Sequence, residues 1–173
     1  MNSTIVAMAG LPATGKSTLA ARLAQEVNGI VLDKDRIRAA VFPPQFIEYS
    51  RQQDDLCMNM LLTAAEYLLR SHPIPFVFLD GRPFARTYQI EQVASFADRL
   101  QCRLKIIQTG CSEATVRARL QQQSSSHPAS NRDLDLYESL KGDWQEITYP
   151  KLLVNTDESL SQAVNVSLSY LRE

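Results

Sequence analysis

A glycine-rich loop that carries a lysine is the part of this chain whose residue types could do chemistry. The string GLPATGKS at 10–17 has the spacing G-x-x-x-x-G-K-S, follows an apolar run and precedes a segment of helical periodicity. Its glycines can adopt backbone conformations closed to other residues, so successive N–H groups can converge on one anion at a helix N-terminus. The spacing therefore predicts a phosphate-binding loop whose nucleotide contacts are Gly10, Leu11, Pro12, Ala13, Thr14, Gly15, Lys16, Ser17 and Thr18.

The negative charge of bound phosphates could be neutralised by three side chains, directly or through a bound cation: Lys16, Ser17 and Asp80. Lys16 is placed to neutralise β- and γ-phosphate oxygens, which makes it a candidate catalytic residue. The Ser17 hydroxyl is a candidate ligand of Mg²⁺, because this hard cation prefers oxygen donors and the nucleotide's own phosphates. Asp80 ends the apolar run FVFLD and is the candidate that orients Mg²⁺ or its water shell, unless it only caps the turn at Gly81.

Two more carboxylates follow the apolar run at 30–32, in the string DKDRIR at 33–38. The carboxyl ends of parallel strands open onto one crevice, so these side chains are expected to reach the phosphate loop. An acceptor hydroxyl in a kinase must lose its proton, and Asp35 is the candidate base, with Asp33 next. Arg38 lies one helical turn further on, where it could hold the acceptor or a phosphate. The alternative is a helix-capping aspartate followed by a solvated, charged turn.

Arginines in the second half of the chain could stabilise a transferring phosphoryl group. Arg82 follows the third apolar run, while Arg119 and Arg132 flank the polar stretch QQQSSSHPASN at 121–131. Guanidinium groups carried by a closing loop would offset negative charge and exclude water. We therefore expect a lid-like segment around 117–133, with Arg132 as a catalytic residue, Arg119 as a nucleotide contact and Arg82 as a substrate contact.

The elements that must position these groups follow an α/β pattern, because apolar runs alternate with helical stripes along the chain. Continuous apolar runs are typical of strands buried on both faces of a parallel sheet. Strands are expected at 4–9, 30–32, 76–79, 104–107 and 152–154.

Three helical stripes lie between or after these strands. The stripe over 58–69 predicts a helix that stops before His72-Pro73. A second helix is expected to carry Leu136, Leu140, Trp144 and Ile147 toward the core. A third is expected at the C-terminus, with Thr156 or Asp157 as its N-cap.

Length and composition predict one domain over residues 1–173, since 45% hydrophobic and 21% charged residues are ordinary globular usage. A net charge of −1 gives no basic field for nonspecific nucleic-acid binding. No apolar run approaches the roughly 20 residues that span a bilayer, and the N-terminus lacks the pattern of a signal peptide. Three cysteines without a C-x-x-C spacing predict free thiols. We therefore expect a cytoplasmic protein without membrane partners, and nucleic acid is disfavoured as a partner.

With these motifs, the sequence resembles the P-loop kinases of the predicted-kinase, AAA_33-like group, relatives of the 5′-kinase domain of polynucleotide kinase, chloramphenicol phosphotransferase and the zeta toxin kinases. The resemblance implies a three-layer P-loop fold with a five-stranded parallel sheet of order 2-3-1-4-5. It also implies a base role for Asp35 with Arg38 as its partner, and a lid arginine near Arg132. It is carried by AGLPATGKSTLA at 9–20, LDKDRIRAAVF at 32–42, VFLDGRPFARTYQI at 77–90 and HPASNRD at 127–133.

The motifs and the resemblance together imply a kinase that uses ATP, or GTP, with Mg²⁺ and phosphorylates a hydroxyl of a small molecule. Two alternatives stay open: a nucleotide-binding regulator without transfer activity, and a polynucleotide 5′-hydroxyl kinase. The balanced charge favours a small acceptor over a polynucleotide. The acceptor and the oligomeric state are not encoded in any motif. The acceptor pocket is expected from segments 42–56 and 82–90, where Phe42, Phe46, Tyr49, Arg51, Gln53 and Asp54 could face the ligand or the core.

Overall fold

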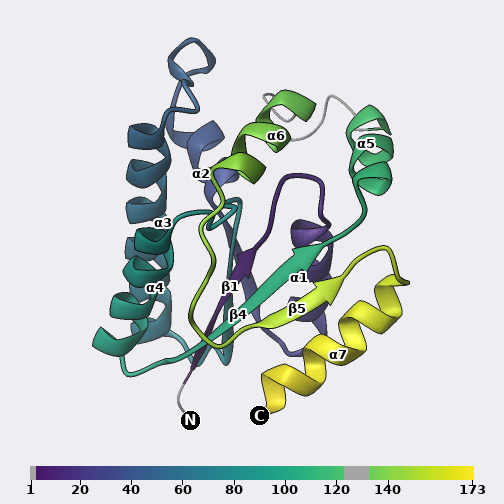
Figure 1. The fold of residues 1–173 in the computed structure, drawn as a ribbon. Coiled ribbons are helices and arrows are strands. Elements are labelled where there is room, and N and C mark those ends of the chain that lie inside the picture. Colours follow the sequence, from purple (N-terminus) through teal and green to yellow (C-terminus); the bar gives the residue numbers. More distant parts are fainter. Residues whose placement is uncertain (1–2, 123–132) are drawn as a thin grey trace.

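Five parallel strands form the centre of the computed structural model, which describes residues 3–122 and 133–173. Their order is β2-β3-β1-β4-β5, as the family resemblance implies (Figure 1). All five predicted strands are confirmed, and the fourth is longer than predicted. The strands are β1 (Thr4–Ala9), β2 (Ile30–Asp33), β3 (Phe76–Asp80), β4 (Arg103–Gly110) and β5 (Leu152–Asn155).

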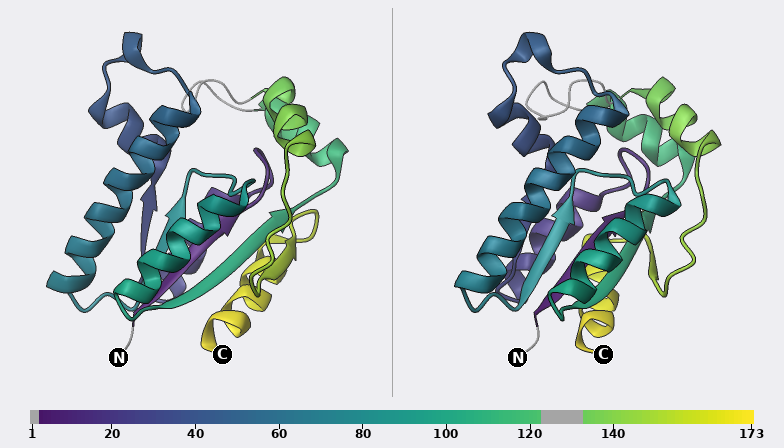
Figure 2. Two further views of the ribbon diagram at one scale, coloured as in Figure 1. Left: turned by 60° about the vertical axis from the view of Figure 1, so that its left-hand side comes forward. Right: turned by 90° about the vertical axis from the view of Figure 1, so that its left-hand side faces the viewer.

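Helices cover both faces of the sheet, so the fold has three layers (Figures 1 and 2). On one face lie α3 (Arg51–Ser71) and α4 (Thr87–Arg99), and on the other lie α1 (Lys16–Glu26) and α7 (Leu160–Arg172). The short α2 (Lys34–Val41) packs beside α3 and is followed by a 3-10 turn, Pro44–Phe46. Two further helices, α5 (Glu113–Gln122) and α6 (Leu134–Gly142), stand beyond the carboxyl ends of the strands.

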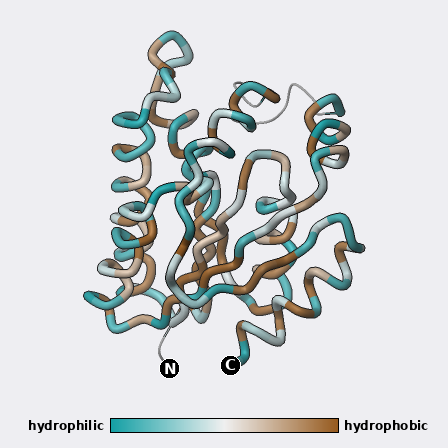
Figure 3. The backbone as a smooth tube through the Cα atoms, in the orientation of Figure 1, coloured by the Kyte–Doolittle hydropathy of each residue, from teal (hydrophilic) through white to brown (hydrophobic). Residues whose placement is uncertain are grey.

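The hydrophobic core is divided in two by the sheet. Residues of α3 and α4 such as Met58 and Ile90 pack on one face, and residues of α1 and α7 such as Leu19 and Leu171 pack on the other. Every residue of β1 is buried, as its unbroken apolar sequence predicts. Figure 3 shows this concentration of hydrophobic residues along the central strands. The burial fixes β1 firmly, and with it the start of the glycine loop.

The helix predicted through Trp144 and Ile147 is wrong in its second half, because α6 ends at Gly142. An irregular segment follows, in which the Gln145 N–H donates to the Ala85 carbonyl at 2.8 Å. Ile147 is buried and Trp144 is half-buried, and both pack against the core from this segment. Their helical spacing therefore reflects burial alone and not a continuous helix.

The predicted N-cap of α7 is also wrong, since Ser159 fills that position and forms a capping box with Gln162. Thr156 and Asp157 are used elsewhere. The Thr156 hydroxyl donates to the Thr14 carbonyl at 2.9 Å, and the Asp157 carboxylate accepts from the Ser112 N–H at 2.7 Å. Both residues tie the loop after β5 to neighbouring loops.

Other structural expectations hold. Helix α3 ends at Ser71, before the predicted stop, and the cysteines Cys57, Cys102 and Cys111 are free thiols. Burial raises the pKa of each thiol above its ordinary value. Within the described residues no helix is both long and apolar enough to cross a bilayer.

Gly10 is the first residue of the loop after β1, and its backbone φ is +134°. A Cβ at this position would lie 2.5 Å from the Thr109 carbonyl oxygen, which belongs to the neighbouring strand and cannot move freely. We therefore expect Gly10→Ala to cost about 1–3 kcal/mol of unfolding free energy. Gly110→Ala is the matched control, because a Cβ there meets nothing within 4 Å. Chemical denaturation of both variants checks this, and equal stabilities would contradict it.

Candidate active site

The loop between β1 and α1 has the geometry of an anion cradle. Ala13 and Gly15 adopt left-handed φ values of 62° and 86°, which fold the chain back over the start of α1. Gly15 is the N-cap of α1 and offers no side-chain hydrogen bond to the first turn. The backbone N–H groups at this helix start are therefore placed to bind an anion, helped by the helix dipole.

Lys16 is held inside the loop that precedes it. Its Nζ donates to the carbonyl oxygens of Gly10 and Leu11, both at 2.8 Å, and the residue is buried. Thr14 braces the same turn, because its hydroxyl donates to the Leu11 carbonyl and shares a hydrogen bond with the Thr109 hydroxyl at 2.8 Å. The ammonium group is thus positioned over the loop before any phosphate arrives.

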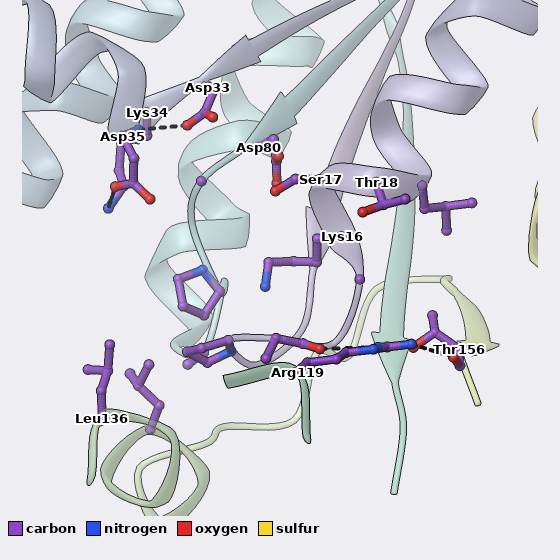
Figure 4. A pocket seen from close by; sticks show the side chains of 18 of the residues that line it. Lys16, Ser17, Thr18, Asp33, Lys34, Asp35, Asp80, Arg119, Leu136 and Thr156 are labelled. Atoms are coloured by element: carbon purple, nitrogen blue, oxygen red, sulfur yellow. Dashed lines mark hydrogen bonds and ion pairs between the residues drawn. The ribbon is translucent and has the colours of Figure 1, made fainter. Parts of the chain in front are cut away.

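One cavity of about 680 Å³ runs from this loop to the predicted acceptor residues (Figure 4). Among the predicted loop contacts, Gly10, Leu11 and Thr14 do not line it and instead form the turn beneath. The others do line it: Pro12, Ala13, Gly15, Lys16, Ser17 and Thr18. Asp33, Asp35, Arg38 and Asp80 line the same cavity, so the structure brings both predicted clusters into a single space.

Asp33 and Asp80 lie side by side, since they are register partners at the ends of β2 and β3. Asp80 is buried, and its Oδ1 accepts no hydrogen bond from the described residues. Asp33 is the N-cap of α2 and accepts from the N–H groups of Asp35 and Arg36, as the capping alternative proposed. Burial raises the pKa of Asp33, and the neighbouring Asp80 charge raises it further.

This carboxylate pair fits a divalent cation. Figure 4 shows Ser17 and the Asp80 carboxylate pointing toward each other beside Lys16. In the described part of the chain, no group of three or more His, Cys, Asp or Glu residues could hold a metal alone. A Mg²⁺ ion here would therefore draw further ligands from phosphate oxygens and water, which is its usual habit.

A buried ion-pair network lies next to this pair and joins α2 to α3. Lys34 Nζ lies 2.6 Å from Asp54 Oδ1 and 3.2 Å from Asp35 Oδ1. Arg38 donates to Asp35 Oδ1 at 2.6 Å and also to Asp54 Oδ1. Lys34 and Arg38 are both almost fully buried, while the carboxylates are partly exposed to the cavity. Asp35 is thus fixed in place by two cations.

The predicted arginines separate into two groups. Arg119 lines the cavity and donates to the Ala13 carbonyl at 3.1 Å and to the Thr156 carbonyl at 2.7 Å, so it is fixed beside the loop. Arg82 does not reach the cavity, because its guanidinium pairs with Asp55 on α3. The arginine on this loop that does line the cavity is Arg86.

The predicted lid lies partly outside the described residues. Residues 117–122 belong to α5, and Asp133 is the N-cap of α6. Arg132 is not among the described residues, so its predicted role stays a prediction. Leu136 and Leu140 of α6 line the cavity instead of the core, contrary to the expectation from their helical stripe.

Sequence reasoning missed Lys34 and Thr156 and left Asp54 undecided. Lys34 lies in the DKDRIR string, where the sequence alone indicates only one more charge of a solvated turn. Of the undecided residues, Tyr49, Arg51 and Asp54 line the cavity. Gln53 instead braces the preceding segment by donating to the Phe46 carbonyl at 2.8 Å, and Phe46 is exposed.

The strand order and the loop define a P-loop fold of the kind found in small kinases. The chain belongs to the AAA_33 family, described as an AAA domain, whose sequence profile matches residues 5–141. A comparison with curated protein sequences gave no match.

Solved structures share the fold over nearly the whole chain. The APS kinase of Mycobacterium tuberculosis in complex with AMPPNP and APS has a TM-score of 0.73 at 14% identity, covering 99% of this chain and 99% of that one. A gluconokinase from Sinorhizobium meliloti 1021 has a TM-score of 0.68 at 17% identity, covering 99% and 92%. Kti12 of Chaetomium thermophilum in complex with ADP-AlF3 has a TM-score of 0.66 at 18% identity, covering 97% and 98%.

The raised pKa of Asp33 predicts a pH-dependent stability. Between the ordinary aspartate pKa and the raised one, the folded chain binds more protons than the unfolded chain, so its stability falls as pH rises. An asparagine at this position cannot ionise yet is as good an N-cap. We expect Asp33→Asn to melt at a higher temperature than wild type at pH 7 in metal-free buffer, and the difference to shrink below about pH 4.

Thermal melting across pH measures this difference. Asp33→Ala is the control, because it also loses the charge but sacrifices the cap at a cost of about 1 kcal/mol. A difference between wild type and Asp33→Asn that does not change with pH would contradict the prediction.

Proposed function

We propose that this protein is a kinase that uses Mg²⁺ and ATP to phosphorylate a hydroxyl group of a small molecule. The observation that carries the proposal is the single cavity that joins the phosphate loop to the Asp35 cluster. Phosphoryl transfer needs both groups within reach of one γ-phosphate, the loop on the donor side and a carboxylate on the acceptor side.

The donor end is formed by the loop and by residues near its outer edge. The loop amides and Lys16 bind the phosphates, and Ser17 with Asp80 holds Mg²⁺. When bound, Mg²⁺ neutralises part of the charge on the β- and γ-phosphates. Arg119 and Thr156 are joined to each other beside the loop and are proposed to contact the rest of the nucleotide.

The acceptor end is formed by Asp35 and its partners. Asp35 uses Oδ1 to accept from Arg38, and its Oδ2 accepts no hydrogen bond from the described residues. We propose that this carboxylate accepts the proton of the acceptor hydroxyl as the hydroxyl oxygen bonds to the γ-phosphorus. The bond from that phosphorus to the β,γ-bridging oxygen breaks in the same transfer, which leaves ADP.

The comparisons support a donor site and a small acceptor. The APS kinase neighbour holds AMPPNP and APS, and the Kti12 neighbour holds ADP-AlF3. A regulator that only binds nucleotide would have no need for the ion-paired cluster of Lys34, Asp35, Arg38 and Asp54 on the cavity wall. A catalytic contact from Arg132 remains part of the proposal.

Asp35→Asn tests the acceptor role directly. We expect it to keep the wild-type affinity for Mg·ATP and to lose about 10²- to 10⁴-fold in acceptor-dependent turnover, since the general base is gone. Asp55→Asn is the matched control, because Asp55 also pairs with a buried arginine but lies outside the main cavity. Turnover can be measured as ADP release across a pool of hydroxyl-bearing metabolites. Full activity of Asp35→Asn would remove it as the base.

Asp80→Asn tests the cation site without any turnover. Titration of ADP with and without Mg²⁺ gives the gain in affinity that the cation provides. We expect the variant to bind Mg²⁺ about 10- to 100-fold more weakly than wild type does. Its affinity for ADP in the absence of Mg²⁺ should equal that of wild type. Asp98→Asn, an exposed position on α4, serves as the control. An unaltered Mg²⁺ dependence in Asp80→Asn would place the cation elsewhere.

A further inference from the structure

We infer that the acceptor is an uncharged, hydroxyl-rich molecule, and that Asp54 sets this preference against anionic acceptors. The inference rests on the proposed kinase function and names the substrate class of the same site. It comes from the ion-pair network of Lys34, Asp35, Arg38 and Asp54, which forms one wall of the cavity.

The buried cations in this wall are already neutralised. Lys34 and Arg38 each contact both Asp35 and Asp54, so two positive charges face two negative ones. A carboxylate or phosphate on the acceptor would have to displace one of these aspartates to gain a cation. Removing a partner from a buried pair is costly, so an anionic acceptor is disfavoured here.

The other cations that line the acceptor end, Arg86 and Arg51, are not part of this buried wall. Arg86 pairs with Asp143 at 2.5 Å, and Arg51 is exposed at the start of α3. Within residues 3–122 and 133–173, the buried cations of this wall therefore all have carboxylate partners. Asp33 and Asp80 add further negative charge next to them.

The wall offers hydrogen-bond acceptors to whatever binds. Asp35 and Asp54 both direct Oδ1 to the cations, and the Oδ2 of each accepts no hydrogen bond from the part of the chain that the structure describes. Hydroxyl groups are donors and match such oxygens, whereas an anionic group brings only more acceptors. Within the network itself, the two cations balance the two carboxylates, so these four residues give no net attraction to an ammonium group.

Tyr49 adds a flat surface to the same end of the cavity. Its ring lies 5.0 Å from the Arg38 guanidinium, and its backbone has a φ of +51°, which a non-glycine residue rarely adopts. Strain of this kind persists where surrounding contacts hold a residue in place. The Tyr49 ring and the Arg38 guanidinium over it therefore help to fix the shape of this end of the cavity.

The test compares compounds that share one carbon framework and either carry or lack a charged group. Protein loaded with Mg·AMPPNP is titrated with glycerol, a pentitol, a hexose and a cyclitol, each also as its carboxylate and phosphate ester, and the hexose also as its amino sugar. Ligand-observed NMR gives the dissociation constants without turnover. For the framework that binds best, we expect the uncharged form to bind at least about tenfold more tightly than every charged form. This ratio corresponds to a difference of about 1.4 kcal/mol in binding free energy.

Asp54→Asn identifies the residue responsible. It leaves Lys34 and Arg38 with one carboxylate between them, so we expect the ratio of anionic to uncharged affinity to rise about tenfold. Asp55→Asn, one residue further along α3 and paired with Arg82 instead, should leave the ratio unchanged. Circular dichroism melts show whether each variant is folded. The substrate class is decided by the dissociation constants of the wild-type protein and does not depend on the two variants.

Tighter binding of any charged form, or no binding by any uncharged member, overturns the inference. An unchanged ratio in a folded Asp54→Asn protein overturns the role of Asp54. Failure of the proposed function would look different, because the protein would then release no ADP from Mg·ATP with any member of the panel, charged or uncharged. A kinase of another substrate class would release ADP with a charged member.

Discussion

Negative charge crowds the carboxyl end of this sheet, and the architecture of the site depends on how that crowding is resolved. Parallel strands end at one edge, which brings Asp33 and Asp80 into register beside the phosphate loop. Asp35 and Asp54 come close to the same edge from α2 and α3, where Lys34 and Arg38 neutralise them. Asp80 is the carboxylate beside Ser17, and its buried Oδ1 accepts no hydrogen bond from the described residues, so a cation fits there. The arrangement therefore divides the aspartates between an acceptor wall and a cation site.

The strands and the loop were predictable from sequence because their signals are local. An unbroken apolar run determines that β1 is buried on both faces, and the glycine spacing determines the loop that follows it. The order of the strands needed the family resemblance, since no periodicity specifies which strands pair. The end of α6 was mispredicted because Trp144 and Ile147 are buried at helical spacing without a helix, held by a backbone contact to Ala85.

The site was predictable where a residue lies in a motif and unpredictable where it depends on tertiary pairing. Asp35 and Arg38 lie one turn apart on one helix, so their pairing follows from spacing. Their link to Asp54 crosses from α2 to α3 and could not be derived from either segment alone. For the same reason no local pattern indicated that Arg82 turns to Asp55.

Nucleotide binding at the donor end depends on the loop of residues 10–18, with Lys16 offsetting the charge of the phosphates. Isothermal titration calorimetry of wild type and Lys16→Ala with Mg·ATP measures this dependence. We expect saturable binding at one site in wild type, and an affinity at least about tenfold weaker in the variant, since a hydrogen bond to a charged group contributes about 1.5–3 kcal/mol. Absence of binding heat in wild type, or identical isotherms for the two proteins, would contradict a phosphate-binding role for this loop.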